Sequence, residues 1–190
     1  PRTVLLKDAE PKDLPLVVKP RSGSGSVGLY RVSSCKLLHG LQAEFGEDYI
    51  AQEDIHAPEK EYPCALVGIR GSVRCLTLHR RLDAGRTVQA VVVREPDIER
   101  LLLDFIEVAP LDGPLNIQIQ VDNEGPKIFE INPRLSSTVK MRHILGFKDL
   151  EWLIRSFDSS WELPDYDVPV GASVFRLSRE ICGSHALDSQ

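Results

Sequence analysis

The sequence predicts an α+β protein whose sheets are antiparallel. Segments with strand character outnumber the helical segments, and strands joined by tight turns outnumber strand–helix–strand units. That pattern is typical of α+β domains and not of doubly wound parallel sheets. The chain has 190 residues, of which 42% are hydrophobic and 27% charged. It is therefore long enough to bury a core, and its composition is that of an ordinary globular protein.

The N-terminal part is expected to combine short strands with one helix. The expected strands are 14–19, closed by Pro20, 29–32 and 48–53. Between the last two, apolar residues recur at helical spacing, with Ser33 or Ser34 as the cap and Gly46 as the stop.

The remainder is expected to be mostly β-hairpins, with a helix opened by Pro96. The expected strands are 62–69, 72–79, 87–93, 115–121, 127–131 and 171–177. Ser136 or Ser137 is expected to cap a short helix that ends at Gly146, and 149–156 forms another. Residues 157–170 are expected to be an ordered loop, because Trp161 gives this segment a large side chain to bury.

Charge and composition exclude several classes of function. The net charge is −5, the sequence pI is about 5.6 and no basic block occurs, so a nucleic-acid partner is not expected. No apolar run approaches the roughly 18 residues of a membrane span, so no membrane partner is expected. The four cysteines are widely spaced, which indicates reduced thiols in a cytoplasmic protein rather than a disulfide or zinc framework.

A glycine-rich loop occupies residues 23–28, directly after the first expected strand. Its letters, Gly-Ser-Gly-Ser-Val-Gly, match the G-x-G-x-x-G pattern, but the chain continues as a strand and not as the helix that a dinucleotide site needs. A Walker A loop is also excluded, because no Gly-Lys-Ser/Thr follows. Two interpretations remain: a loop that lays backbone N–H groups on phosphate oxygens beside Lys19, or a surface hairpin loop with an exposed lysine.

Polar side chains gather on one face of the hairpin expected from 115–121 and 127–131. A three-residue turn, Asn123-Glu124-Gly125, would place Gln118 opposite Glu130 and Asn116 opposite Asn132. Directly opposed residues on one face have Cβ atoms about 5 Å apart. These oxygen ligands suit Mg²⁺, a hard ion that shares its coordination shell with phosphates. The alternative is a solvated polar face of a half-exposed sheet.

Taken in order, four motifs resemble the ATP-grasp superfamily, most closely the large subunit of carbamoyl phosphate synthetase. The resemblance spans roughly residues 10–155. The motifs are VVKPRSGSGSVG, YIAQEDI with Glu61 further on, GPLNIQIQ, and FEINPRLSST. Four motifs in the right order are far more specific than any one of them.

The resemblance implies an ATP-grasp fold, in which ATP lies between two α+β subdomains with antiparallel sheets. It implies that residues 1–53 form a small lid subdomain, that 54–181 form a larger subdomain with the metal site, and that 182–190 form a tail. A further N-terminal domain of the family is missing here, so the chain is expected to be a fragment or to act with a missing domain or as a homo-oligomer.

The resemblance also assigns roles to residues. Lys19 would bind the ATP phosphates, Glu61 the ribose, and Arg134 the phosphoryl group in transfer. The loop closing over the phosphates would consist of Ser22, Gly23, Ser24, Gly25, Ser26 and Gly28. The strand beside the adenine would be Glu53, Asp54 and Ile55. The metal ligands would be Gln118, Glu130 and Asn132, with Gln118 standing where many relatives have an acid.

The implied activity is that of an ATP- and Mg²⁺-dependent ligase, with Mn²⁺ as a substitute metal. Such an enzyme phosphorylates a small carboxylate and lets an amine or thiol displace the phosphate. The alternative is a non-catalytic or incomplete ATP-binding module that needs another domain or chain. The residues do not separate the two, because the phosphate and metal ligands would be the same in both.

Overall fold

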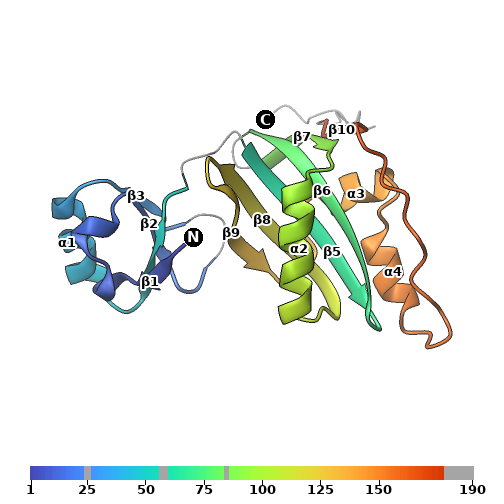
Figure 1. The fold of residues 1–190 in the computed structure, drawn as a ribbon, viewed down its shortest axis with the longest axis horizontal. Helices are drawn as coiled ribbons and strands as arrows, with labels where there is room; N and C mark the ends of the chain where they lie inside the picture. Colours follow the sequence, from blue (N-terminus) through green and yellow to red (C-terminus); the bar gives the residue numbers. More distant parts are fainter. Residues whose placement is uncertain (24–26, 56–59, 84–85, 178–190) are drawn as a thin grey trace, which may run out of the picture. The chain divides into compact units, whose positions relative to one another are not determined.

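The computed structural model describes residues 1–23, 27–55, 60–83 and 86–177 (Figure 1). The chain divides into two compact units. The first consists of Pro1–Glu61 together with Gln118–Glu130, and the second consists of Tyr62–Ile117 together with Ile131–Gln190. The predicted lid boundary at residue 53 stays a prediction. The predicted tail, 182–190, also stays one, because it lies outside the described residues.

The first unit contains a four-stranded antiparallel sheet with the order β1-β4-β2-β3. Its strands are β1 (Thr3–Leu5), β2 (Leu16–Pro20), β3 (Tyr30–Val32) and β4 (Tyr49–Glu53). The three later strands agree with the sequence prediction. The sequence analysis missed β1 and the two 3-10 helices after it, η1 (Leu6–Asp8) and η2 (Pro11–Asp13), because three-residue elements leave no periodicity.

Helix α1 (Cys35–Phe45) begins and ends where its sequence predicts. Ser34 is the N-cap, and its hydroxyl oxygen accepts a hydrogen bond from the Leu37 amide at 3.4 Å. Gly46 ends the helix with φ +42°. The helix buries Leu38 and Leu41 in a core shared with strand residues such as Val18 and Val32.

A six-stranded sheet has the order β10-β7-β6-β5-β8-β9. Its strands are β5 (Glu61–Ile69), β6 (Ser72–Asp83), β7 (Arg86–Val92), β8 (Gly113–Asp122), β9 (Gly125–Asn132) and β10 (Ser173–Phe175). The predicted turn at Arg70-Gly71 is present, with φ +49° and +82°, and it joins β5 to β6 in antiparallel register. The structure is therefore α+β with antiparallel pairing, as predicted.

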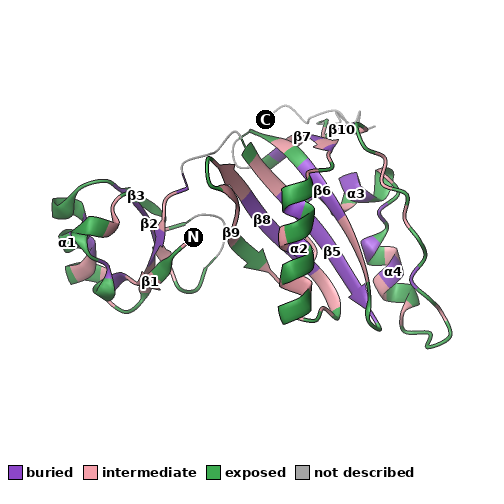
Figure 2. Cartoon of the chain, viewed as in Figure 1, coloured by how far each residue is buried: buried purple, intermediate pink, exposed green. Residues whose placement is uncertain are grey.

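Three helices accompany this sheet: α2 (Pro96–Val108), α3 (Val139–Ile144) and α4 (Asp149–Arg155). Figure 2 shows burial concentrated along the central strands, and β5 is buried from Pro63 through Ile69. The main core joins these strands to Met141, Phe147 and Trp152. None of the helices in the described part of the chain is long and apolar enough to cross a membrane.

The predicted ordered loop after α4 is present. Trp161 is half-buried and packs against the main core. Arg70 holds this loop by donating to the backbone oxygens of Trp161 at 2.6 Å, Ser156 at 2.5 Å and Asp158 at 3.0 Å.

Two local predictions were wrong. The N-cap of α3 is Thr138 rather than Ser136 or Ser137, and it makes no side-chain cap bond. The hydroxyl oxygens of Ser136 and Thr138 accept hydrogen bonds from Arg142, and the Ser136 oxygen also accepts from the Thr138 amide at 3.4 Å, so neither hydroxyl caps the first turn of α3. The turn between β8 and β9 has two residues between the strands, because Gly125 already belongs to β9 with φ +119°.

Position 68 requires glycine because there is no room for a side chain, and not because of its backbone conformation. A Cβ added to Gly68 would lie 2.1 Å from the backbone oxygen of Leu111. We expect Gly68→Ala to lower the free energy of unfolding by about 1–3 kcal/mol, the usual cost of overpacking. Gly40→Ala, in α1 with nothing within 4 Å of the added atom, should instead raise it by about 0.5–1 kcal/mol. Urea unfolding of both variants measures this, and equal effects at the two positions would contradict the packing.

Candidate functional site

Lys19 lies on β2, paired with Ile50 of β4. Its ammonium donates to Oε1 of Gln52 at 3.0 Å and to the backbone oxygen of Phe129 at 3.2 Å. Partial burial lowers the pKa of Lys19, and the negative charge of Glu130 acts in the opposite direction. The structure therefore brings this lysine together with β9, the strand that carries the predicted acidic ligand.

The glycine loop is described only at its two ends. Ser22, Gly23 and Gly28 are described, whereas Ser24, Gly25 and Ser26 lie outside the described residues. Gly28 has φ +73°, and a Cβ there would lie 2.8 Å from the hydroxyl oxygen of Tyr49. Position 28 therefore needs glycine for both conformation and space.

The predicted base-contacting strand lies at the end of β4. The amide of Glu53 donates to the Arg2 backbone oxygen at 2.9 Å, and that of Asp54 donates to the Pro15 oxygen at 3.2 Å. The Asp54 carboxylate is bound by Arg31, with N–O distances of 2.6 and 2.7 Å. The structure thus uses two of the three backbone amides internally.

Ile55 and Glu61 complete this predicted segment. Ile55 is buried, and Glu61 is the first residue of β5. The residues between them, 56–59, lie outside the described residues.

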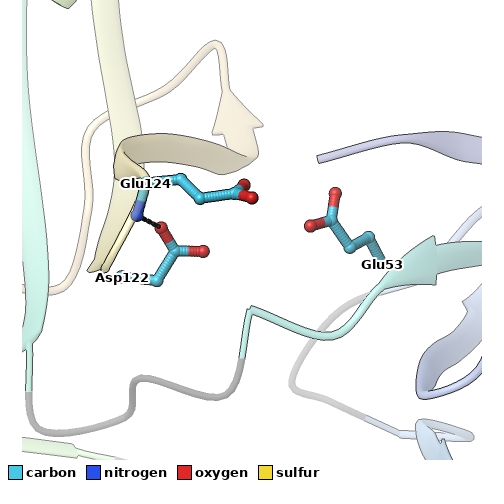
Figure 3. Close-up of side chains that lie close together, drawn as sticks. All are labelled: Glu53, Asp122 and Glu124. Atoms are coloured by element: carbon cyan, nitrogen blue, oxygen red, sulfur yellow. Dashed lines mark hydrogen bonds between the residues drawn. The ribbon is translucent and has the colours of Figure 1, made fainter.

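The Glu53 side chain belongs to an ion-pair network that the sequence analysis missed. The ammonium of Lys127 on β9 lies 3.0 Å from Glu53, 2.9 Å from Asp122 and 2.7 Å from Glu124. Figure 3 shows Glu124 and Glu53 facing each other, with the Glu124 amide bonded to Asp122. These carboxylates raise the pKa of Lys127 strongly, and Lys127 in turn lowers the pKa of Glu53.

This acidic cluster has the spacing of a cation site, because its ligand oxygens all lie within 4.8 Å of one another. The Lys127 ammonium already pairs with all three carboxylates. We therefore interpret the cluster as an ion-pair network that holds the end of β4 to the β8–β9 turn. No sequence signal indicated that Glu53 joins this cluster, because it lies 74 residues before Lys127 in the chain.

Predicted metal ligands occupy β8 and β9. Gln118 is only 7% exposed, and its Oε1 is buried with no hydrogen-bond partner among the described residues. Glu130 is exposed and Asn132 half-buried, and alternate positions of a strand share one face. The predicted pairing of Gln118 opposite Glu130 stays a prediction.

Arg134, the residue predicted to bind the phosphoryl group, lies two positions after Asn132 in the chain. Arg134 donates to Oδ1 of Asn132 at 3.3 Å and to the backbone oxygen of Leu135 at 3.2 Å. It is exposed, so its guanidinium is accessible to an anion.

The donor set fits a hard cation. Glutamine, glutamate and asparagine side chains offer oxygen ligands, which Mg²⁺ prefers. A buried acceptor without a partner costs about 1–3 kcal/mol, and ligation of a cation by Gln118 would remove that cost.

Comparisons with known proteins identify the family and the fold. The family model described as "ATP-grasp in the biosynthetic pathway with Ter operon" matches residues 55–176. Among curated proteins, no sequence matches the chain.

Several solved structures share the fold. N5-carboxyaminoimidazole synthetase from Staphylococcus aureus, complexed with ADP, is 15% identical with a TM-score of 0.71 over 92% of this chain and 51% of that one. Biotin carboxylase from Campylobacter jejuni, in a β,γ-ATP complex, is 18% identical with a TM-score of 0.62 over 80% and 38%. The biotin carboxylase domain of Hydrogenobacter thermophilus 2-oxoglutarate carboxylase, with MgADP and bicarbonate, is 14% identical with a TM-score of 0.64 over 84% and 40%.

The chain thus spans about half the length of the first of these structures. The family match covers well over half of the chain, and the predicted ATP-grasp fold is confirmed. Closeness to carbamoyl phosphate synthetase is a finer statement and stays a prediction. This chain belongs to the ATP-grasp superfamily, in the family of ATP-grasp proteins of the biosynthetic pathway with the Ter operon.

Proposed function

We propose that this chain is the ATP-grasp part of an ATP- and Mg²⁺-dependent ligase that joins a small carboxylate to an amine or thiol through an acyl phosphate. One observation carries the proposal. The ammonium of the half-buried Lys19 donates a hydrogen bond to the Phe129 backbone oxygen on β9, and the negative charge of the neighbouring Glu130 acts on it. A nucleoside triphosphate with its metal requires a cation for the phosphates and a ligand for the metal close to each other.

Lys19 would bind the phosphates. Its ammonium donates to two neutral acceptors, the Gln52 amide oxygen and the Phe129 backbone oxygen, and a phosphate oxygen would be a stronger acceptor for the same ammonium. The segment from Ser22 to Gly28 would lay backbone N–H groups on the phosphates.

The end of β4 would bind the base and the ribose. Because the amides of Glu53 and Asp54 donate to Arg2 and Pro15, we assign the hinge hydrogen bond from the protein to the amide of Ile55. Glu61, at the start of β5, would accept from the ribose hydroxyls. The Lys127 network supports this arrangement by fixing the Glu53 side chain away from a ligand role.

Gln118, Glu130 and Asn132 would hold Mg²⁺, which when bound neutralises phosphate charge and orients the phosphates. Arg134 would stabilise the phosphoryl group as it moves to the carboxylate oxygen, where the P–O bond to ADP breaks and a new P–O bond forms. The amine or thiol then attacks the acyl carbon, loses its proton and releases inorganic phosphate. Such transfer needs positioning and charge stabilisation more than a protein nucleophile.

The proposed metal ligands predict that ATP binding depends on Mg²⁺. We expect calorimetry to give at least tenfold weaker binding of ATP in EDTA than with Mg²⁺, about 1.4 kcal/mol, because Lys19 and Arg134 leave much phosphate charge uncompensated. Lys19→Met should weaken binding in both conditions, which serves as the control for a metal-independent contact. Equal affinity with and without Mg²⁺ would contradict the metal site.

Glu130 is the single acid of the proposed metal ligands, so its charge should matter most. Glu130→Gln should reduce ADP formation at least a hundredfold, about 2.7 kcal/mol in the barrier, while changing the unfolding free energy by less than about 1 kcal/mol. Gln118→Ala should be milder, because water can replace a neutral ligand. The matched control is Glu107→Gln on the exposed surface of α2.

These variants are assayed for ADP release with a panel of small carboxylates and amines or thiols. If the MgATP affinity and the turnover of Glu130→Gln both stay within threefold of those of the unaltered chain, the metal site is contradicted. The polar residues of the β8–β9 hairpin are then an ordinary solvated sheet face. Binding of MgATP without ADP release across the panel would favour the alternative, an ATP-binding module that acts with another domain or chain.

A further inference from the structure

A neutral side chain lies against the ammonium of Lys19 on one face of the N-terminal sheet. Thr3 of β1 and Val17 of β2 both pair with Gln52 of β4 in antiparallel register. Lys19 is two positions after Val17, so its side chain lies on the same face as that of Gln52, diagonally across from it. The ammonium donates to Oε1 of Gln52 at 3.0 Å, and Gln52 is only 9% exposed. The lysine is therefore held by a buried amide of its own sheet.

The orientation of the Gln52 amide follows from its partners. Lys19 can only donate, so the amide atom that faces it is the oxygen. The amide nitrogen donates to the Thr3 hydroxyl oxygen at 3.0 Å, and that hydroxyl donates to the Pro1 backbone oxygen at 3.3 Å. A reversed amide would turn its N–H groups toward the ammonium and lose the bond to Lys19. These contacts therefore keep an acceptor directed at Lys19.

Both groups that accept hydrogen bonds from the Lys19 ammonium are neutral. The second is the Phe129 backbone oxygen at 3.2 Å, and within the described part of the chain the ammonium has no further acceptor. An ammonium group carries three protons, so one N–H is left for a ligand. The negative charge of Glu130 also acts on the ammonium. Lys19 is thus held in place without a hydrogen-bonded carboxylate that would compete with an anionic ligand.

We propose that Gln52 is the positioning residue of Lys19, and that it must be neutral for Lys19 to bind an anion. The inference rests on the proposed function, because it takes Lys19 as the residue that binds the phosphates. A carboxylate at position 52 would form an ion pair with Lys19, and charge-assisted hydrogen bonds are roughly twice as strong as neutral ones. A phosphate would then compete with a permanent anion for the same ammonium. Gln52 holds the ammonium through an amide, which is a weaker competitor.

The test is Gln52→Glu, which changes the charge of the side chain and keeps its shape. The Thr3 hydroxyl can donate to a carboxylate oxygen, so the local hydrogen bonds persist. Arg31, on the same face, is already bound to Asp54, so the new carboxylate pairs with Lys19. We expect ATP binding with Mg²⁺ to weaken at least about tenfold, whereas adenosine, which lacks the phosphates, should bind within about twofold of the unaltered affinity. The melting temperature should change by less than about 3 °C.

Three further variants separate the effect of charge from those of shape and of overall charge. Gln52→Met keeps the length of the side chain and removes the acceptor, so ATP affinity should fall only about two- to fivefold, the range of one neutral hydrogen bond. Ala43→Glu is the matched charge control, because residue 43 is exposed on α1 and α1 packs on the opposite sheet face, which bears Val18. Its ATP affinity should stay within about twofold. If Gln52→Glu acts through Lys19, adding it to Lys19→Met should cause no further loss.

Calorimetry of ATP and adenosine, with thermal unfolding of every variant, gives distinct outcomes. If the ATP affinity of Gln52→Glu stays within about twofold of that of the unaltered chain, or if adenosine loses as much affinity as ATP, this inference alone is overturned. A further loss of ATP affinity in the Lys19→Met background indicates direct repulsion and overturns the positioning role. Gln52→Met keeps the test valid if Gln52→Glu does not fold, because an unchanged ATP affinity of Gln52→Met also overturns that role. Failure of the unaltered chain to bind ATP overturns the proposed function and this inference with it.

Discussion

Ion pairing at the tip of the β8–β9 hairpin is the interaction on which the candidate site depends. Lys127 gathers Glu53, Asp122 and Glu124 around one ammonium, and Lys19 adds a hydrogen bond to the Phe129 backbone. Through these contacts residues 118–130 belong to the same compact unit as the N-terminal sheet, although more than 60 residues separate them in the chain. The elements that bear Lys19, Glu53 and Glu130 are thereby assembled into one structure.

Much of this architecture was predictable because it is encoded locally. The Ser34 cap and Gly46 stop of α1, the Arg70-Gly71 turn and the alternating polar residues of β8 each depend on neighbours a few positions away. The order of the motifs then identified the superfamily, because four short patterns in sequence are far more specific than one.

The parts that could not be predicted depend on contacts between distant residues. Nothing in the sequence around Lys127 indicates that Glu53 completes its ion pairs. Arg142 similarly donates to the hydroxyl oxygens of Ser136 and Thr138, a contact that the local capping rule does not include, and the predicted cap at Ser136 or Ser137 was wrong. The two-residue turn at Asn123-Glu124 is a smaller miss of the same kind, since Gly125 could either close the turn or open the strand.

The lowered pKa of Lys19 links ligand binding to protons. Burial disfavours its charged form, so the free chain has a reduced pKa at this position. An anion placed on the ammonium would favour the charged form and raise the pKa again. Between the two values binding must take up a proton, so affinity for an anionic ligand falls as the pH rises through the pKa of the free chain. The partial burial of Lys19 would thus make the proposed anion binding weaker at alkaline pH.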